Sequence, residues 1–177
     1  MSDGLLLRLY GPGWSGVRTA SGRYVVEGAK DVSPWATIVT GAQHRVMPRD
    51  QVEPTTWDYA VMALGKEPNA WAAGGEGRLT ILAPHAAEFL LDVPRMQLAC
   101  TRLQASKLLA AVPMRGRISV VVDTDRHRSE LLAEVRRGFE QAVGDRVCAF
   151  PFTIENGRVT GLVLEEPKGG KPWWKLW

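Results

Sequence analysis

Short apolar runs broken by glycine and proline dominate the first third of the chain, a pattern typical of strands and turns. The runs cover residues 5–10, 23–27, 35–40 and 44–47. We expect the first two to form one antiparallel pair and the last two another. Thr55 or Thr56 is then predicted to cap a short helix that ends at Gly65. Residues 1–65 are therefore predicted to form a β-rich N-terminal portion.

The rest of the chain mixes strand-like and helix-like periodicity. Strands are expected at residues 79–82, 88–91, 107–112, 117–122, 147–154 and 158–164. One helix is expected to begin at Pro94, and another to follow from Leu131 with its apolar residues on one face. The glycine-rich stretch 66–77 predicts a linker or long loop.

Tight turns join these strands, which favours antiparallel pairing. Asn156-Gly157, in particular, is a dipeptide that favours a type I′ hairpin. We therefore predict an α+β fold with a mostly antiparallel sheet and two main helices. Residues 78–165 are expected to form the α+β portion, either as a unit of its own or as one domain with residues 1–65. Residues 166–177 are predicted to be a flexible tail.

A family resemblance lies in this second portion. The run 88–94, the helix after it and the run 108–116, which contains an apolar-Val-Pro-x-Arg turn, resemble YtpQ-like bacterial proteins of unknown function. In that group a strand-helix-hairpin-helix unit carries a comparable turn. The likeness covers residues 78–158 and implies an α+β fold, but it brings no established activity with it.

The composition is that of an ordinary globular protein. With 177 residues, 45% of them hydrophobic and 23% charged, the chain can build one core and is not disordered. Its net charge of +3 is spread along the sequence, so nucleic-acid binding is not expected. Cys100 and Cys148 lack zinc-site spacing, and no cofactor is predicted. Without a signal peptide or an apolar run of membrane-spanning length, we expect a cytoplasmic protein.

One segment offers candidate metal ligands or catalytic carboxylates. Asp123, Asp125 and His127 directly follow the Val-rich run 117–122, and this opening resembles that of haloacid-dehalogenase-type phosphatases. The small and apolar residues expected after the second aspartate are replaced by arginine and histidine. A metal-dependent phosphatase or hydrolase is therefore kept as the alternative function. The favoured interpretation is that this acidic segment caps the following helix.

Other motifs favour structural explanations. The run 11–16 matches G-x-G-x-x-G by letter, but a strand rather than a helix is expected after it, so we interpret it as a hairpin loop. No G-x-S-x-G elbow accompanies the three isolated histidines, and no hydrolytic triad is predicted. A group of arginines could clamp phosphates or form a solvated helix face: Arg115, Arg117, Arg126, Arg128, Arg136 and Arg137.

The last seven residues hold three of the seven tryptophans in the chain. They follow a stretch of charges and breakers, so we expect them to act as anchors on a tether. The predicted partner-binding residues are Lys171, Trp173, Trp174, Lys175, Leu176 and Trp177. The leading hypothesis is a non-catalytic protein-binding or accessory module whose partner is another protein or a neighbouring subunit. Folding back onto its own domain and weak peripheral attachment to a membrane surface are the alternatives for the tail.

Overall fold

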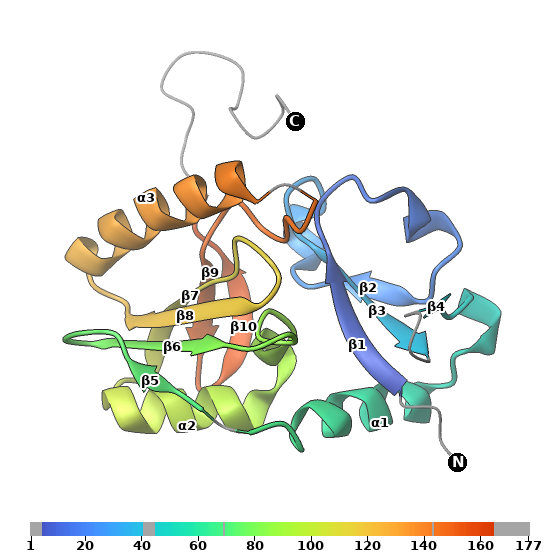
Figure 1. The fold of residues 1–177 in the computed structure, drawn as a ribbon, viewed down its shortest axis with the longest axis horizontal. Helices are drawn as coiled ribbons and strands as arrows, with labels where there is room; N and C mark the ends of the chain where they lie inside the picture. The colour runs from blue at the N-terminus through green and yellow to red at the C-terminus, as the bar shows by residue number, and fades with distance from the viewer. Residues whose placement is uncertain (1–4, 41–44, 69, 143, 165–177) are drawn as a thin grey trace.

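The computed structural model describes residues 5–40, 45–68, 70–142 and 144–164. Within these ranges the chain forms three α-helices and two antiparallel sheets, which confirms the predicted α+β fold (Figure 1). No helix in the described ranges is long and apolar enough to cross a lipid bilayer.

The N-terminal sheet has an order that the sequence pattern did not predict. Its strands are β1 (Leu5–Tyr10), β2 (Gly22–Tyr24), β3 (Trp35–Thr40) and β4 (Arg45–Val46). Strand β3 is central, and β1 pairs with it rather than with β2. The expected hairpin between the runs 5–10 and 23–27 is therefore wrong. Because the intervening segment folds into a short 3-10 helix, η1 (Ser15–Arg18), it does not turn the chain directly back along β1.

Helix α1 (Pro54–Leu64) follows as expected and is succeeded by Gly65. Neither threonine caps it, since both lie inside its first turn and Glu53 is the N-cap residue without a side-chain bond. The proline at the first helical position starts the helix instead, because its fixed φ suits the first turn and its missing N–H is not needed there. The predicted loop after α1 contains the short strand β5 (Ala72–Ala73).

The second sheet has the order β10-β9-β7-β8-β6-β5, with every neighbouring pair antiparallel. Its longer strands are β6 (Arg78–Leu82), β7 (Lys107–Ala111), β8 (Arg117–Val122), β9 (Phe152–Glu155) and β10 (Arg158–Leu162). Asn156 and Gly157 have φ values of 50° and 81°, so the predicted hairpin between β9 and β10 is confirmed. The register of β10 shifts between Val159 and Gly161, where the strand bulges.

The run 88–91 is not a strand. It forms a 3-10 helix, η4 (Glu88–Leu91), whose side chains at 88, 89 and 90 are all buried. A short apolar run is compatible with either structure, and here Asp92 ends it by capping the next helix, α2 (Val93–Leu103), through a bond from the Arg95 amide. The predicted helix beginning near Pro94 is thereby confirmed.

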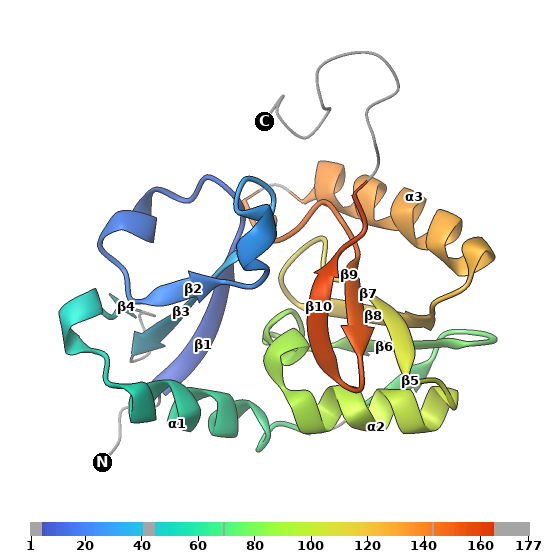
Figure 2. The ribbon, with the colours of Figure 1, turned by 180° about the vertical axis from the view of Figure 1, so that it is seen from behind.

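The two faces of the second sheet are covered by different elements (Figures 1 and 2). Leu109, Ala111 and Val121 pack under helix α3 (Asp125–Gln141) through Leu131 and Val135. The alternate residues of the same strands point into a larger core that α2 and the N-terminal sheet share. That core contains Leu7, Ile38, Phe89, Met96, Leu108, Val120 and Phe150.

Two side chains join the free edge of β1 to the second half of the chain. The Leu9 amide donates to Oε1 of Glu88 at 3.1 Å, and Arg115 Nη2 donates to the Leu9 carbonyl at 3.1 Å. Both groups on Leu9 are the kind that a neighbouring strand would satisfy. Glu88 and Arg115 therefore stand in for a missing strand at this edge.

Candidate functional site

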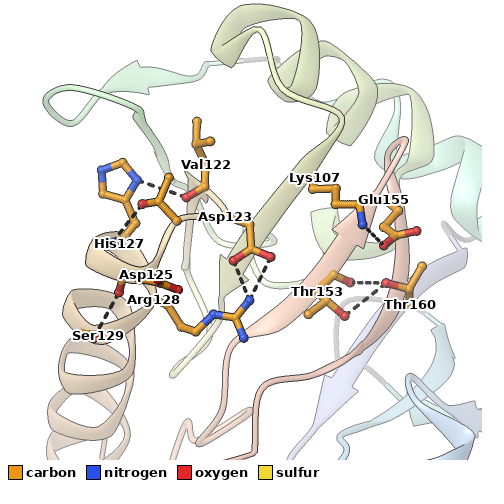
Figure 3. Close-up of polar contacts among 11 residues, drawn as sticks. Lys107, Val122, Asp123, Asp125, His127, Arg128, Ser129, Thr153, Glu155 and Thr160 are labelled. Carbon is orange, nitrogen blue, oxygen red and sulfur yellow. Dashed lines mark hydrogen bonds and ion pairs between the residues drawn. The ribbon is translucent and has the colours of Figure 1, made fainter.

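The acidic segment after β8 forms the start of helix α3 (Figure 3). Thr124 is the N-cap residue, and its hydroxyl accepts the His127 amide at 3.2 Å. Asp125 is exposed in the first turn, where the helix dipole stabilises a negative charge. These contacts give the segment a helix-capping role.

The other candidate ligands in this segment are engaged and face apart (Figure 3). Both carboxylate oxygens of Asp123 accept from Nη2 of Arg128, at 2.7 and 3.0 Å. His127 Nδ1 lies 3.0 Å from the carbonyl of Val122, so its ring turns back to the strand. In the described parts of the chain, no three His, Cys, Asp or Glu side chains gather closely enough to hold a metal ion. The structure thus does not bring Asp123, Asp125 and His127 together.

Polar residues on the neighbouring strands also pair among themselves. Lys107 and Glu155 face each other across β7 and β9 and form an ion pair at 3.3 Å. The hydroxyls of Thr153 and Thr160 lie 3.1 Å apart across β9 and β10. Both pairs are visible in Figure 3, well separated from His127. These groups are cross-strand contacts that stabilise the sheet.

The arginines do not form a single cluster. Arg117 and Arg78 share the carboxylate of Glu134, which fastens α3 to β6 and β8. Arg126 and Arg136 pair with glutamates one turn along α3, and Arg115 reaches β1. This arrangement matches the interpretation of a solvated helix face with i, i+4 pairs.

The run 11–16 carries no nucleotide-binding helix. Helix η1, which begins inside this run at Ser15, has only four residues, and Trp14 stacks on Tyr10 with ring centroids 4.0 Å apart. The loop therefore packs an aromatic pair against β1.

The cysteines are free thiols in different surroundings. Cys148 is fully buried, and burial raises its pKa to about 12. Cys100 is half-buried, and burial raises its pKa as well. Since the thiolate is the reactive form, neither environment activates a nucleophile.

A groove between α1 and α2 is the candidate binding site that sequence reasoning missed. Its volume is about 600 Å³, within the range of ligand and peptide sites. Mostly apolar groups line it: Val61, Met62, Gly65, Lys66, Pro94 and Leu98. The available signal was in α1, where Tyr59 and Met62 are apolar although Ala60 and Leu64 already form its buried face.

The floor of this groove is a buried ion pair. Arg95, only 3% exposed, donates to Asp92 Oδ2 at 3.0 Å. Its terminal nitrogens donate to the carbonyls of Leu64, Glu67 and Pro68 at 2.8 to 2.9 Å. Arg95 therefore ties the end of α1 to the start of α2, and it fixes the spacing of the groove walls.

Exposed apolar side chains lie in and beside the groove. Five large hydrophobic residues are strongly exposed in the described structure: Tyr59, Met62, Leu82, Leu98 and Leu164. Met62, at 64%, and Leu98, at 39%, line the groove, and Tyr59 lies one turn before Met62 on α1. Apolar side chains grouped in this way mark a surface suited to binding another apolar segment.

The predicted anchors, Lys171 to Trp177, lie outside the described residues. Leu164, two residues beyond the end of β10, is 52% exposed. The tail therefore follows a residue at the surface of the domain.

No protein-family model, curated protein or solved structure matches the chain. The resemblance to YtpQ-like proteins thus stays a prediction.

Proposed function

We propose that this chain is a non-catalytic protein-binding module that docks on a partner through its C-terminal tail. The observation that carries the proposal is the concentration of three tryptophans within residues 171–177. The described body supports it, because the Asp123 carboxylate is held in an ion pair with Arg128 and the His127 ring lies against the Val122 carbonyl.

The tail has the composition of a set of interface anchors. Tryptophan is enriched among residues that dominate binding energies, and each ring can bury roughly 150–250 Å² of surface. Lys171 and Lys175 alternate with these rings and supply charge at the rim of an interface. Attachment to lipid by so few lysines would be weak and would be lost in salt. A protein groove therefore suits this segment better than a membrane surface.

Replacement of Trp173, Trp174 and Trp177 by alanine tests the proposal. The full chain and this variant are used to capture proteins from cells of the source organism, and the most enriched partner is purified for a binary titration by calorimetry. We expect the variant to bind at least about 100-fold more weakly, since each lost anchor contributes about 1 kcal/mol or more. A Lys168→Ala variant, with the anchors intact, serves as the control.

Equal affinity of the variant and the full chain for that partner would contradict the proposal. So would capture of no protein together with flotation on phosphatidylserine vesicles at low salt, which would favour the membrane alternative. Circular dichroism and thermal unfolding of the variant confirm that the body is intact in either case.

A further inference from the structure

We infer that the groove between α1 and α2 binds the tryptophan-rich tail of a second copy of this chain. The inference rests on the proposed function, because it names the partner that the tail engages. Each copy would carry both halves of the contact, a groove on α1 and α2 and a tail after β10.

The chemistry of the groove matches the chemistry of the tail. Apolar side chains line the groove, and its largest exposed groups are those of Met62 and Leu98. A flexible methionine thioether makes favourable contacts with aromatic rings of varied orientation. The segment 173–177 offers three indole rings and a leucine within five residues.

The walls of the groove are already fixed before a ligand arrives. Arg95 links the last carbonyls of α1 to Asp92 at the cap of α2, as described above. Its guanidinium also lies 3.8 Å from the centre of the Phe89 ring. Rigid walls lower the entropy that binding would otherwise cost.

Two exposed acidic residues next to the lining residues of the groove in the sequence favour a basic ligand. Asp58 is exposed one turn before Met62 on α1, and Glu67 is exposed just beyond the helix. Lys66, which lines the groove itself, is a basic residue between them in the sequence. Lys171 and Lys175 flank Trp173 and Trp174 and carry a charge opposite to that of these two acids.

The path of the chain favours a second copy over the groove of the same molecule. Gly157 lies against Val93 and Gln97 of α2, and from there β10 runs away from α2 toward α3 (Figure 2). Val163 packs with the cluster under α3, on the face of the sheet opposite the one that α2 covers.

To reach its own groove, the tail would have to cross from one face of the sheet to the other. The nine residues that follow Leu164, up to Trp173, span at most about 30 Å when extended. The tail of a neighbouring copy can enter the groove directly. Such a contact joins unlike surfaces, so it closes a dimer by reciprocal exchange or forms a chain of copies.

The test is sedimentation velocity of the full chain from about 1 to 200 µM, a range that covers weak and moderate self-association. We expect concentration-dependent association that is lost in two variants: Met62→Glu with Leu98→Glu in the groove, and the triple Trp→Ala change in the tail. Leu82→Glu is the matched control, because Leu82 is 75% exposed on β6 and does not line the groove. This control should associate like the full chain.

Mixing the two variants provides the decisive measurement. One retains a tail without a groove and the other a groove without tryptophans, so together they should form a one-to-one complex that neither forms alone. A synthetic peptide of residues 165–177 should bind the tail variant and should bind the groove variant at least about tenfold more weakly.

A full chain that is monomeric over the whole range would overturn the inference. Peptide binding by the tail variant alone, with no self-association of the full chain, would overturn it too and would place the tail in its own groove. A third outcome separates the two proposals: the full chain stays monomeric in sedimentation, but the triple Trp→Ala change abolishes binding of the protein captured from cells. The proposed function then stands, and only this inference fails. If the full chain does not self-associate and the triple Trp→Ala change does not weaken partner binding, both the proposed function and this inference fail.

Discussion

At the residue scale, Arg95 shows how a buried charge completes secondary structure. The last carbonyls of a helix have no intrahelical donors, and at the end of α1 Arg95 supplies donors to Leu64 and, just beyond, Glu67. Its own charge is balanced by Asp92, which is 4% exposed. A buried guanidinium with this many partners orients two helices, and it stabilises the fold only while all the partners are present.

Replacing Arg95 by methionine removes those donors and leaves the Asp92 carboxylate buried without its counter-ion. We expect the free energy of unfolding to fall by about 3–5 kcal/mol in urea titrations. Arg126→Met is the matched control, because the Arg126 side chain is 79% exposed and its pair with Glu130 lies in solvent. This control should change stability by less than about 0.5 kcal/mol. Similar losses in both variants would show that Arg95 is not an organising contact.

Cys148 makes stability depend on pH in the alkaline range. Burial raises the pKa of the folded thiol from 9.0 to about 12, so the unfolded chain releases this proton first. The free energy of unfolding should therefore fall as pH rises above about 9, by at most about 1.4 kcal/mol per pH unit. The fall between pH 8.5 and 10 in urea titrations should be smaller in Cys148→Ala than in Cys100→Ala. An identical fall in both variants would argue against this role for Cys148.

At the scale of elements, some turn and helix-start signals gave the right structure, whereas pairings between distant segments could not be predicted from the sequence. The Asn156-Gly157 hairpin and the Pro94 helix start were predictable, because turn and cap chemistry act over a few residues. The pairing of β1 with β3 was not, since it depends on which strand is buried on both faces. The groove escaped prediction for a similar reason. Its walls belong to helices separated by β5, β6 and η4, and only tertiary folding brings Met62 near Leu98.

The β9–β10 hairpin offers a sharp test of this local chemistry. Gly157 has a φ of 81°, and a Cβ there would lie 2.9 Å from the backbone N of Gln97 and from the Val93 carbonyl. Gly157→Ala should lower the free energy of unfolding by about 2 kcal/mol or more, through strain and crowding against α2. Gly28→Ala is the control, since a Cβ at Gly28 meets nothing within 4 Å. Chemical denaturation that ranks Gly28→Ala as the more harmful change would contradict the expectation.

At the scale of the whole molecule, the two sheets are joined by one core and by the contacts on Leu9. Residues from both sheets belong to the same hydrophobic cluster, so neither sheet buries its apolar face alone. Glu88 and Arg115 add polar contacts at the edge of β1, where an unpaired strand would otherwise expose its backbone. The candidate groove depends on this union, because α1 packs on β1 while α2 belongs to the second half.

Glu88→Ala tests the hydrogen bond between the Leu9 amide and the Glu88 carboxylate. The change leaves the buried Leu9 amide without an acceptor, and we expect a loss of about 1–3 kcal/mol in the free energy of unfolding. Hydrogen exchange of the Leu9 amide should accelerate at the same time. Glu88→Gln keeps an acceptor oxygen and should retain most of the stability and the protection. If the glutamine variant exchanges as fast as the alanine variant, the bond to Glu88 is not what protects Leu9.

The contacts on Leu9 can form only in a fixed order during synthesis of the chain. Glu88 lies 79 positions after Leu9 in the chain, and Arg115 lies 106 positions after it. A ribosome adds about 5–20 residues per second, so the edge of β1 emerges and waits about 5–20 seconds for its second partner. During that interval nascent chains on the same messenger RNA expose the same unpaired edge. We therefore expect newly made copies to be open to mispairing through the free edge of β1 until residue 115 has been added.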